Sequence, residues 1–287
     1  MIPIFKEHYY PFANCHMFEL RIARGCVFNC KYCWLRNYVK GRLTPEYANL
    51  LMISKTMRKA WYVLRRALYQ EVLINVCEFC DGVILQKGRL LDFLYRTAKE
   101  LNKRLGVNYK LLIVTKGCVT RLYEVDMSDV FVYSISVNTE KVAKKYEQKA
   151  PLPHVRIDFL HKLLDRGYEC RVRIDPIIPE SHVEEYVELI RSINAERFTI
   201  GCLRRSPKLS RKYYNDISWF NYCSEHSIWG FSLPREIREV YFKTLINEAI
   251  KRGKVGVCKD EVGLRILKEV QDGKNYCNCI LGFNKIP

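Results

Sequence analysis

The sequence predicts an α/β fold, either a partly open (β/α)6 barrel or a doubly wound parallel sheet. Short apolar β-branched segments alternate with amphipathic helical patterns between residues 16 and 202, as in parallel sheets that helices cover. Six such strand–helix units are too few for a closed eight-stranded barrel. A length of 287 residues fits a single barrel or two smaller domains.

The expected strands are runs of β-branched, apolar and aromatic residues at 16–23, 72–77, 110–115, 130–136, 170–178 and 197–202. Helical periodicity predicts helices near 54–70, 90–105, 139–149, 153–166 and 181–194. The last of these is expected to start at Ser181, with Glu184 three residues later in a capping-box pattern. Gly167 follows the 153–166 helix, where a left-handed residue is favoured.

Residues 213–287 break the alternation. They contain an aromatic-rich segment, a long helical pattern near 233–252 and a cysteine-bearing tail. We therefore expect a barrel domain over residues 1–212 and a C-terminal helical, Cys-rich cap over 213–287.

The chain is strongly basic, with 48 Lys and Arg against 31 Asp and Glu and a formal net charge of +17. This balance favours a polyanionic partner, nucleic acid first and an anionic membrane surface second, and the alternative is a solvated lysine-rich surface. The basic residues are dispersed, for example at Lys59, Arg65, Arg66, Arg204, Arg205, Lys208, Arg211 and Lys212. No apolar run is long enough to span a membrane and no secretory signal is evident, so we expect a cytoplasmic protein with no membrane partner.

Thirteen cysteines is an odd number, and in a reducing compartment clustered cysteines usually bind metal or catalyse a reaction. Disulfides stay open for cysteines outside the clusters, because intracellular hyperthermophile proteins can be rich in them.

The strongest motif is RGCVFNCKYCWLR at 24–36, directly after the first expected strand. Cys26, Cys30 and Cys33 form a C-x3-C-x2-C array, so three thiolates could hold one iron–sulfur cluster and leave one iron open for a chelating ligand. A zinc knuckle or a chance match is the alternative. Structural zinc requires four ligands, and no His or Cys lies just beyond to complete the set.

This array resembles the cluster loop of the radical S-adenosylmethionine enzymes, in which Tyr32 occupies the aromatic position before the last cysteine. Further blocks follow in the order of the spore photoproduct lyase-like branch, also called DNA repair photolyase-like: CEFCDGVIL (77–85), LLIVTKG (111–117), VYSISVN (132–138), KKYEQKAP (144–151), RIDFLHKLLDRGYECRVRIDPIIP (156–179) and FTIGCLRR (198–205). The resemblance covers residues 15–205. It implies a partial (β/α)6 TIM-like barrel, a 4Fe-4S cluster, S-adenosylmethionine, and a reductant such as ferredoxin or flavodoxin.

The resemblance also implies roles for single residues near the strand ends. Glu78 or Asp81 would receive the amino group of S-adenosylmethionine, although Asp81 could instead cap the next helix. Lys116 would pair with its carboxylate, and Ser136 and Asn138 match the family's SxN block. Tyr32, Trp34 and Arg173 are further candidate contacts; Trp34 could equally pack within its loop, and Arg173 could form a structural ion pair with Asp175.

Two further sets of cysteines are candidates. Spore photoproduct lyase carries a hydrogen-atom-donating cysteine near the second strand, and Cys77 and Cys80 lie near that place without matching its register. Buried, inert cysteines are the alternative. Cys258, Cys277 and Cys279 form a C-x18-C-x-C set, to which Cys202 or Cys223 could add a fourth thiolate. An auxiliary iron–sulfur cluster, a zinc site or a disulfide would fit.

We therefore predict a radical S-adenosylmethionine enzyme that abstracts hydrogen from a nucleic-acid substrate, DNA or RNA. One alternative keeps this chemistry but acts on a protein or small metabolite. Another is a non-enzymatic zinc protein that binds nucleic acid through its basic surface.

Overall fold

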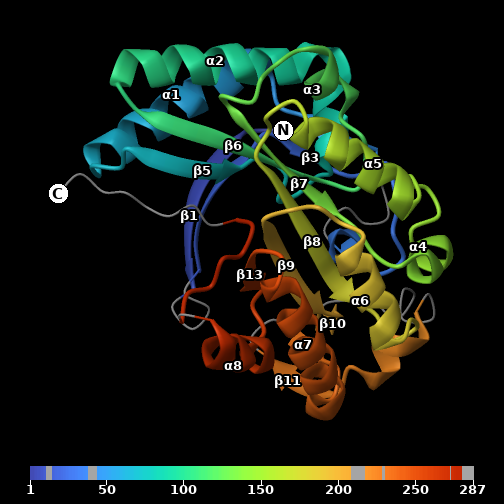
Figure 1. Ribbon diagram of the computed structural model, residues 1–287. Helices are drawn as coiled ribbons and strands as arrows, with labels where there is room; N and C mark the ends of the chain where they lie inside the picture. The colour runs from blue at the N-terminus through green and yellow to red at the C-terminus, as the bar shows by residue number, and fades with distance from the viewer. Residues whose placement is uncertain (11–14, 38–43, 208–216, 228–229, 272, 280–287) are drawn as a thin grey trace.

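An eight-stranded sheet curls through the molecule, and its helices lie around the outside of the curve (Figure 1). The structure is a computed structural model that describes residues 1–10, 15–37, 44–207, 217–227, 230–271 and 273–279. The strand order is β1-β2-β5-β6-β7-β8-β9-β13, with β1 antiparallel to β2 and the other neighbours parallel. In these ranges β1 and β13 are the two unjoined edges, so the expected partial barrel is confirmed.

The main strands are β1 (Ile4–Tyr10), β2 (Cys15–Arg21), β5 (Glu71–Asn75), β6 (Asn108–Thr115), β7 (Phe131–Ser136), β8 (Cys170–Ile177), β9 (Arg197–Cys202) and β13 (Lys254–Val257). The helices are α1 (Leu50–Arg66), α2 (Leu90–Leu105), α3 (Thr120–Glu124), α4 (Glu140–Tyr146), α5 (Pro153–Leu164), α6 (Val183–Arg191), α7 (Arg235–Ile250) and α8 (Glu261–Val270). Smaller elements are β3 (Ala23–Arg24), β4 (Glu46–Tyr47), β10 (Arg204–Arg205), β11 (Glu225–Ser227), β12 (Gly230–Ser232), and the 3-10 helices η2 (Trp34–Asn37), η3 (Gly82–Arg89) and η5 (Ser218–Tyr222).

All six expected strands and all six expected helices, including α7 for the pattern near 233–252, are present within a few residues. Gly167 has a φ of 80°, as its place after α5 predicted. The expected start of α6 is wrong by one residue, because His182 is the N-cap and Glu185 accepts a 3.0 Å hydrogen bond from its backbone N–H. The Ser181 hydroxyl instead contacts Glu185 and Thr139.

The strands β1 and β13 were not expected. β1 is a half-exposed edge strand, and β13 is only four residues long, so neither produces a strong apolar pattern. β13 belongs to residues 213–287, the segment expected to form a cap, yet it pairs with β9. The proposed boundary at 212/213 and the basic residues Lys208, Arg211 and Lys212 lie outside the described residues, and the division into two domains stays a prediction.

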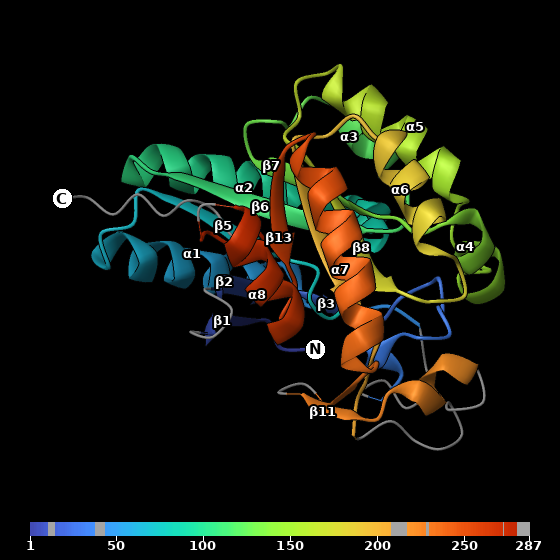
Figure 2. The same ribbon diagram turned by 60° about the horizontal axis from the view of Figure 1, so that its bottom comes forward.

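The two faces of the sheet pack differently. On β5, Val72 and Ile74 join the large core between the strands and the helices, because alternate side chains point to opposite faces. Leu73 joins a small cluster with Leu112 and Val132 on the other face, against which Cys279 packs. The chain's tail therefore lies against the concave face, where Figures 1 and 2 show it passing from α8 beside β13.

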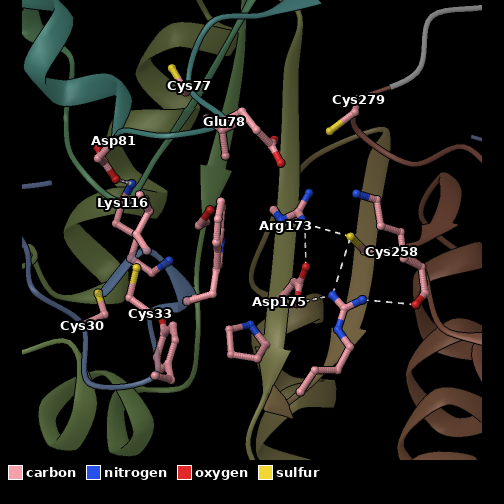
Figure 3. A pocket seen from close by; sticks show the side chains of 18 of the residues that line it. Cys30, Cys33, Cys77, Glu78, Asp81, Lys116, Arg173, Asp175, Cys258 and Cys279 are labelled. Atoms are coloured by element: carbon pink, nitrogen blue, oxygen red, sulfur yellow. Dashed lines mark hydrogen bonds and ion pairs between the residues drawn. The ribbon is translucent and has the colours of Figure 1, made fainter. Parts of the chain in front are cut away.

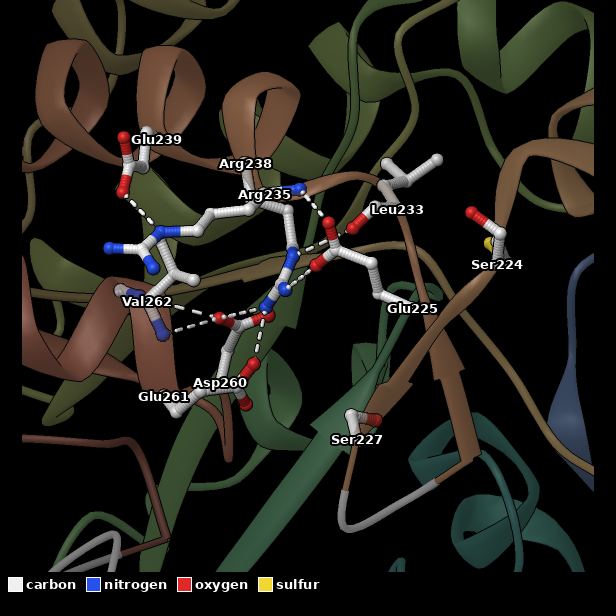
Figure 4. Close-up of polar contacts among 12 residues, drawn as sticks. Ser224, Glu225, Ser227, Leu233, Arg235, Arg238, Glu239, Asp260, Glu261 and Val262 are labelled. Atoms are coloured by element: carbon white, nitrogen blue, oxygen red, sulfur yellow. Dashed lines mark hydrogen bonds and ion pairs between the residues drawn. The ribbon is translucent and has the colours of Figure 1, made fainter.

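A buried ion network joins α7 to β11 and to the start of α8 (Figure 4). The Arg238 guanidinium, 2% exposed, pairs with Asp260 at 2.9 Å, Glu261 at 2.8 Å and Glu225 at 2.6 Å. Its Nε also donates to the carbonyl of Leu233 at 2.8 Å. Because a buried guanidinium needs this many partners to offset its desolvation, the network fixes α7 against the turn between β13 and α8.

Candidate active site

A cavity of about 420 Å³ lies where the strand ends face the concave side of the sheet (Figure 3). All but one of the site residues predicted from the sequence line it: Cys26, Cys30, Tyr32, Cys33, Trp34, Cys77, Glu78, Cys80, Asp81, Lys116, Ser136, Arg173, Cys258, Cys277 and Cys279. The structure thus brings residues from seven separate stretches of chain to one cavity. Asn138 is the exception.

The loop that carries the first three cysteines is fixed by backbone contacts. The N–H of Gly25 donates to the carbonyl of Phe79 at 2.9 Å, and that of Lys31 donates to the carbonyl of Tyr146 at 2.9 Å. Asn29 turns the loop with a left-handed φ of 51°, a conformation that asparagine tolerates well. The loop is therefore held from the turn after β5 on one side and from α4 on the other.

The three loop thiols are buried or half-buried, and burial raises the pKa of Cys26 to about 12. No three His, Cys, Asp or Glu side chains in the described part of the chain gather closely enough to hold a single metal ion. A four-iron cluster does not require this, because each thiolate binds a different iron. Three thiols on one loop beside a cavity suit such a cluster.

A buried ion pair supports this loop from α4 and α5. Glu147 and Arg156 meet at 2.6 Å with both side chains at 0% exposure, and the Tyr32 hydroxyl donates to Glu147. Lys116 lies nearby, with its Nζ 5.5 Å from the Tyr32 ring centroid. Burial opposes the charge of Lys116, but Glu147 and Cys30 raise its pKa above the ordinary value. Lys116 is therefore a cation at the cavity.

The turn after β5 presents two carboxylates in different ways. Asp81 accepts hydrogen bonds from the Thr115 hydroxyl at 2.5 Å and from the backbone N–H groups of Lys116 at 2.9 Å and Val83 at 3.0 Å. It caps η3, which is the structural role weighed in the sequence analysis. Glu78 accepts a hydrogen bond from the Asn75 amide at 3.1 Å, and its carboxylate points into the cavity (Figure 3).

The same turn carries two cysteines that contact each other. Cys80 forms a hydrogen bond with Cys77 that, together with burial, raises its pKa well above the ordinary value. The Cys80 Sγ also lies 3.7 Å from the carbonyl oxygen of Val76. Cys80 is therefore a protonated thiol at neutral pH, and S–H is the form from which a hydrogen atom can be transferred.

The two residues of the SxN block lie in different surroundings. Ser136, at the end of β7, lines the cavity. Asn138 is 1% exposed: its amide donates to the carbonyl of Pro176 at 2.8 Å, and its Oδ1 accepts from the Tyr186 hydroxyl at 2.8 Å. Asn138 thus joins the turn after β7 to the end of β8 and to α6, and its predicted cofactor contact stays untested.

Trp34 packs within its own loop, which was the alternative to its stacking on a ligand. Its ring meets that of Phe79 edge-on at 5.3 Å. The side chain is still 41% exposed and lines the cavity. One face of the ring is therefore used by the fold, and contact with a ligand stays a prediction.

The opposite wall is built by β8, β10 and the turn after β13. Arg173 pairs with Asp175 at 2.5 Å, and Arg204 lies 3.7 Å from the same carboxylate. The Arg173 guanidinium also donates to the Cys258 sulfur at 2.9 Å (Figure 3). Burial opposes ionisation of Asp175, but Arg173 and Arg204 hold the pKa of its carboxyl below the ordinary value.

The tail brings two more cysteines to this wall. Its Asn278 amide donates to Ser134 at 2.9 Å and to the carbonyl of Val172 at 2.8 Å, and its backbone N–H donates to Thr199 at 2.7 Å. These bonds tie the tail to β7, β8 and β9 and fix its neighbours Cys277 and Cys279 beside the cavity.

Several residues of the site escaped the sequence analysis. Cys15, at the start of β2, and Lys259, after β13, also line the cavity. Glu147 and Arg156 lie within the sequence blocks that resemble the family. Their pairing was not predicted, because they are nine residues apart and a helix starts between them. For Lys259, no spacing signal was present.

The fold is similar to that of solved proteins, some of which are bound to S-adenosylmethionine. No protein-family model matches the chain. The structure of SuiB from Streptococcus suis bound to S-adenosylmethionine superimposes with a TM-score of 0.51 at 12% identity, over 87% of this chain and 51% of that one.

The likeness is stronger to spore photoproduct lyase. Its structure complexed with dinucleoside spore photoproduct superimposes with a TM-score of 0.69 at 19% identity, over 88% of this chain and 78% of that one. The resemblance predicted from the sequence is thereby confirmed for the fold.

Two curated proteins are similar in sequence. Spore photoproduct lyase of Clostridium acetobutylicum is 24% identical over 183 residues, covering 63% of this chain and 52% of that protein. The uncharacterized protein ORF301 of Acidianus two-tailed virus is 28% identical over 196 residues, 63% of each chain. This chain therefore spans about half to two thirds of these relatives.

Proposed function

We propose that this chain is a radical S-adenosylmethionine enzyme. One observation supports it most: the three-cysteine loop opens onto the same cavity as the turns after β5, β6 and β7, within a fold similar to spore photoproduct lyase. The sequence predicted each of these segments at the end of a strand. In the fold they border one cavity, as a single catalytic site requires.

Within this proposal the loop thiols Cys26, Cys30 and Cys33 would hold a 4Fe-4S cluster. S-adenosylmethionine bound there would supply a 5′-deoxyadenosyl radical for hydrogen abstraction. Glu78 is the better candidate than Asp81 for the cofactor's ammonium, because the Asp81 carboxylate already accepts three protein hydrogen bonds.

The remaining cavity residues would position the cofactor and the reacting groups. Lys116 would pair with the cofactor's carboxylate, and Ser136 could hydrogen-bond to it. Tyr32 orders the loop through Glu147, and Trp34 borders the opening. Cys80, kept protonated by burial and by Cys77, is the candidate hydrogen-atom donor to a product radical.

For the substrate we propose a nucleic acid. The formal charge of +17 attracts a phosphate backbone, and the similar spore photoproduct lyase was solved with a dinucleoside photoproduct. None of the helices in the described ranges is both long and apolar enough to cross a membrane. A cytoplasmic location, a ferredoxin- or flavodoxin-type reductant, and a second metal site at Cys258, Cys277 and Cys279 stay predictions.

The activity is tested by anaerobic incubation with dithionite and S-adenosylmethionine, with 5′-deoxyadenosine as the measured product. The wild type should form it, and Cys30→Ala should not. Cys118→Ala is the matched control, because Cys118 is a half-buried thiol that does not line the cavity. Wild-type protein that binds iron yet forms no 5′-deoxyadenosine would contradict the proposal, as would colourless protein carrying zinc.

The substrate class is tested separately by binding of DNA and RNA oligonucleotides at several salt concentrations. Affinity for a phosphate backbone should fall steeply as salt rises. Cofactor cleavage without any salt-dependent binding would favour a protein or small metabolite as substrate.

A further inference from the structure

The wall opposite the three-cysteine loop carries a second group of thiols. Cys258 and Cys277 are in hydrogen-bonding contact, and Cys277 also contacts Cys279. All three line the cavity, and Cys258 and Cys279 lie across it from Cys30 and Cys33 (Figure 3). None of the thirteen cysteines, all within the described ranges, is disulfide-bonded.

The fold supplies a fourth thiol from a distant part of the chain. Cys15 at the start of β2 lines the same cavity, and Cys277 and Cys258 are among its neighbours there. The fourth ligands considered from the sequence fit less well. The charged neighbours of Cys202 are Asp260, Arg238, Asp175 and Arg204 rather than thiols, and the Cys223 sulfur faces backbone carbonyls at 3.6–3.9 Å.

The charges around these thiols favour an anionic occupant. Arg173, Arg204 and Lys259 border them, with Asp175 as the acid that pairs with both arginines. Asp260 also acts on Arg204, and Glu78 acts on Lys259. Both arginines nevertheless donate to the Cys258 sulfur, and a buried guanidinium is stabilised where its hydrogen-bond partners carry negative charge. Four neutral thiols or a disulfide would not supply that charge. Four thiolates around a metal centre would, since a four-iron cluster with four thiolates has a net charge of about −2.

The backbone is shaped to hold the tail thiols at this distance. Gly256 of β13 lets the tail approach, because a Cβ there would lie 2.1 Å from the backbone nitrogen of Cys277. The Asn275 side chain accepts from the N–H of Val257 at 2.8 Å and donates to its carbonyl at 3.0 Å. The thiol wall is thus built from β2, β13 and an ordered tail.

We propose that Cys15, Cys258, Cys277 and Cys279 bind a second iron–sulfur cluster, next to the cavity and apart from the three-cysteine loop. A cluster suits the arrangement better than zinc. Zinc needs all four sulfurs about 2.3 Å from one point, and no three such ligands gather that closely in the described part of the chain. Binding releases the thiol protons, as metal thiolates require.

The test counts iron and acid-labile sulfide in the full-length chain after anaerobic reconstitution. The wild type should hold about eight iron atoms, and the Cys26→Ala/Cys30→Ala/Cys33→Ala variant about four with absorbance near 400 nm retained. Adding Cys15→Ser to that variant should abolish the remainder, whereas adding the control Cys202→Ser should not. This readout is independent of cofactor cleavage, so the second site and the proposed enzyme activity can fail separately.

Three outcomes would overturn the proposal. The triple variant could hold no iron, it could hold zinc without sulfide, or alkylation mapping could find Cys258 and Cys277 disulfide-bonded in the metal-free protein. Should the triple variant not fold, single substitutions in the wild type decide: Cys15→Ser should hold about four iron atoms and Cys202→Ser about eight. Equal iron in these two would refute the role of Cys15.

Discussion

Replacing Glu147 with Gln should destabilise the protein by about 3–5 kcal/mol, the usual cost of leaving one member of a buried ion pair without its partner. The Arg156 guanidinium lies 2.6 Å from Glu147, and both side chains are fully buried. Its other partners are the carbonyl oxygens of Ser136 at 3.0 Å and Pro151 at 2.6 Å, which carry no net charge. Gln keeps the shape and an acceptor for the Tyr32 hydroxyl, so the substitution isolates the charge.

Urea denaturation of the metal-free protein measures the free energy of unfolding. The matched control is Glu140→Gln at the start of the same helix, where the carboxylate pairs with Lys144 and His154 at 41% exposure; exposed pairs contribute less than about 1 kcal/mol. The double variant Glu147→Gln/Arg156→Met should recover most of the lost stability, because it removes the orphaned cation. If Glu147→Gln costs no more than Glu140→Gln, the reasoning is refuted.

Three further outcomes follow from single contacts. Burial raises the pKa of Asp81 above 3.8, so the folded protein keeps this proton to higher pH than the unfolded chain. The free energy of unfolding should therefore fall as pH rises above about 3.8. If the wild type and Asp81→Asn show the same dependence of this free energy on pH, the prediction is wrong. Gly256→Ala should displace the tail at a cost of about 1–3 kcal/mol and speed thiol labelling of Cys277. The control Lys268→Ala, on the exposed face of α8, should leave the labelling rate unchanged. Asn138→Ala removes three hydrogen bonds of a buried side chain and should cost about 1–3 kcal/mol in urea denaturation. A loss no greater than that of the exposed cap variant Asn49→Ala would show that those bonds are weak.

The proposed site combines a local part and a long-range part. The loop from Cys26 to Cys33 has its ligand spacing within eight residues, so the sequence is sufficient to predict it. The wall that faces it depends on Cys15 and Cys258, which are separated by most of the chain and meet only after the sheet has curled. Cysteine spacing predicted a tail site, but it led to Cys202 or Cys223 as the fourth ligand, where the fold offers Cys15.

The strand–helix alternation, the strand-end positions of Asp81, Lys116 and Ser136, and the three-thiol motif follow from the sequence, because each depends on neighbours a few residues apart. Contacts between distant segments required the tertiary structure. It alone showed that Glu147 and Arg156 support the three-cysteine loop, that Asn138 is buried away from the cavity, and that β13 extends the sheet. Such pairings depend on how the sheet curves and which of its faces the helices cover. Neither can be predicted from a few neighbouring residues.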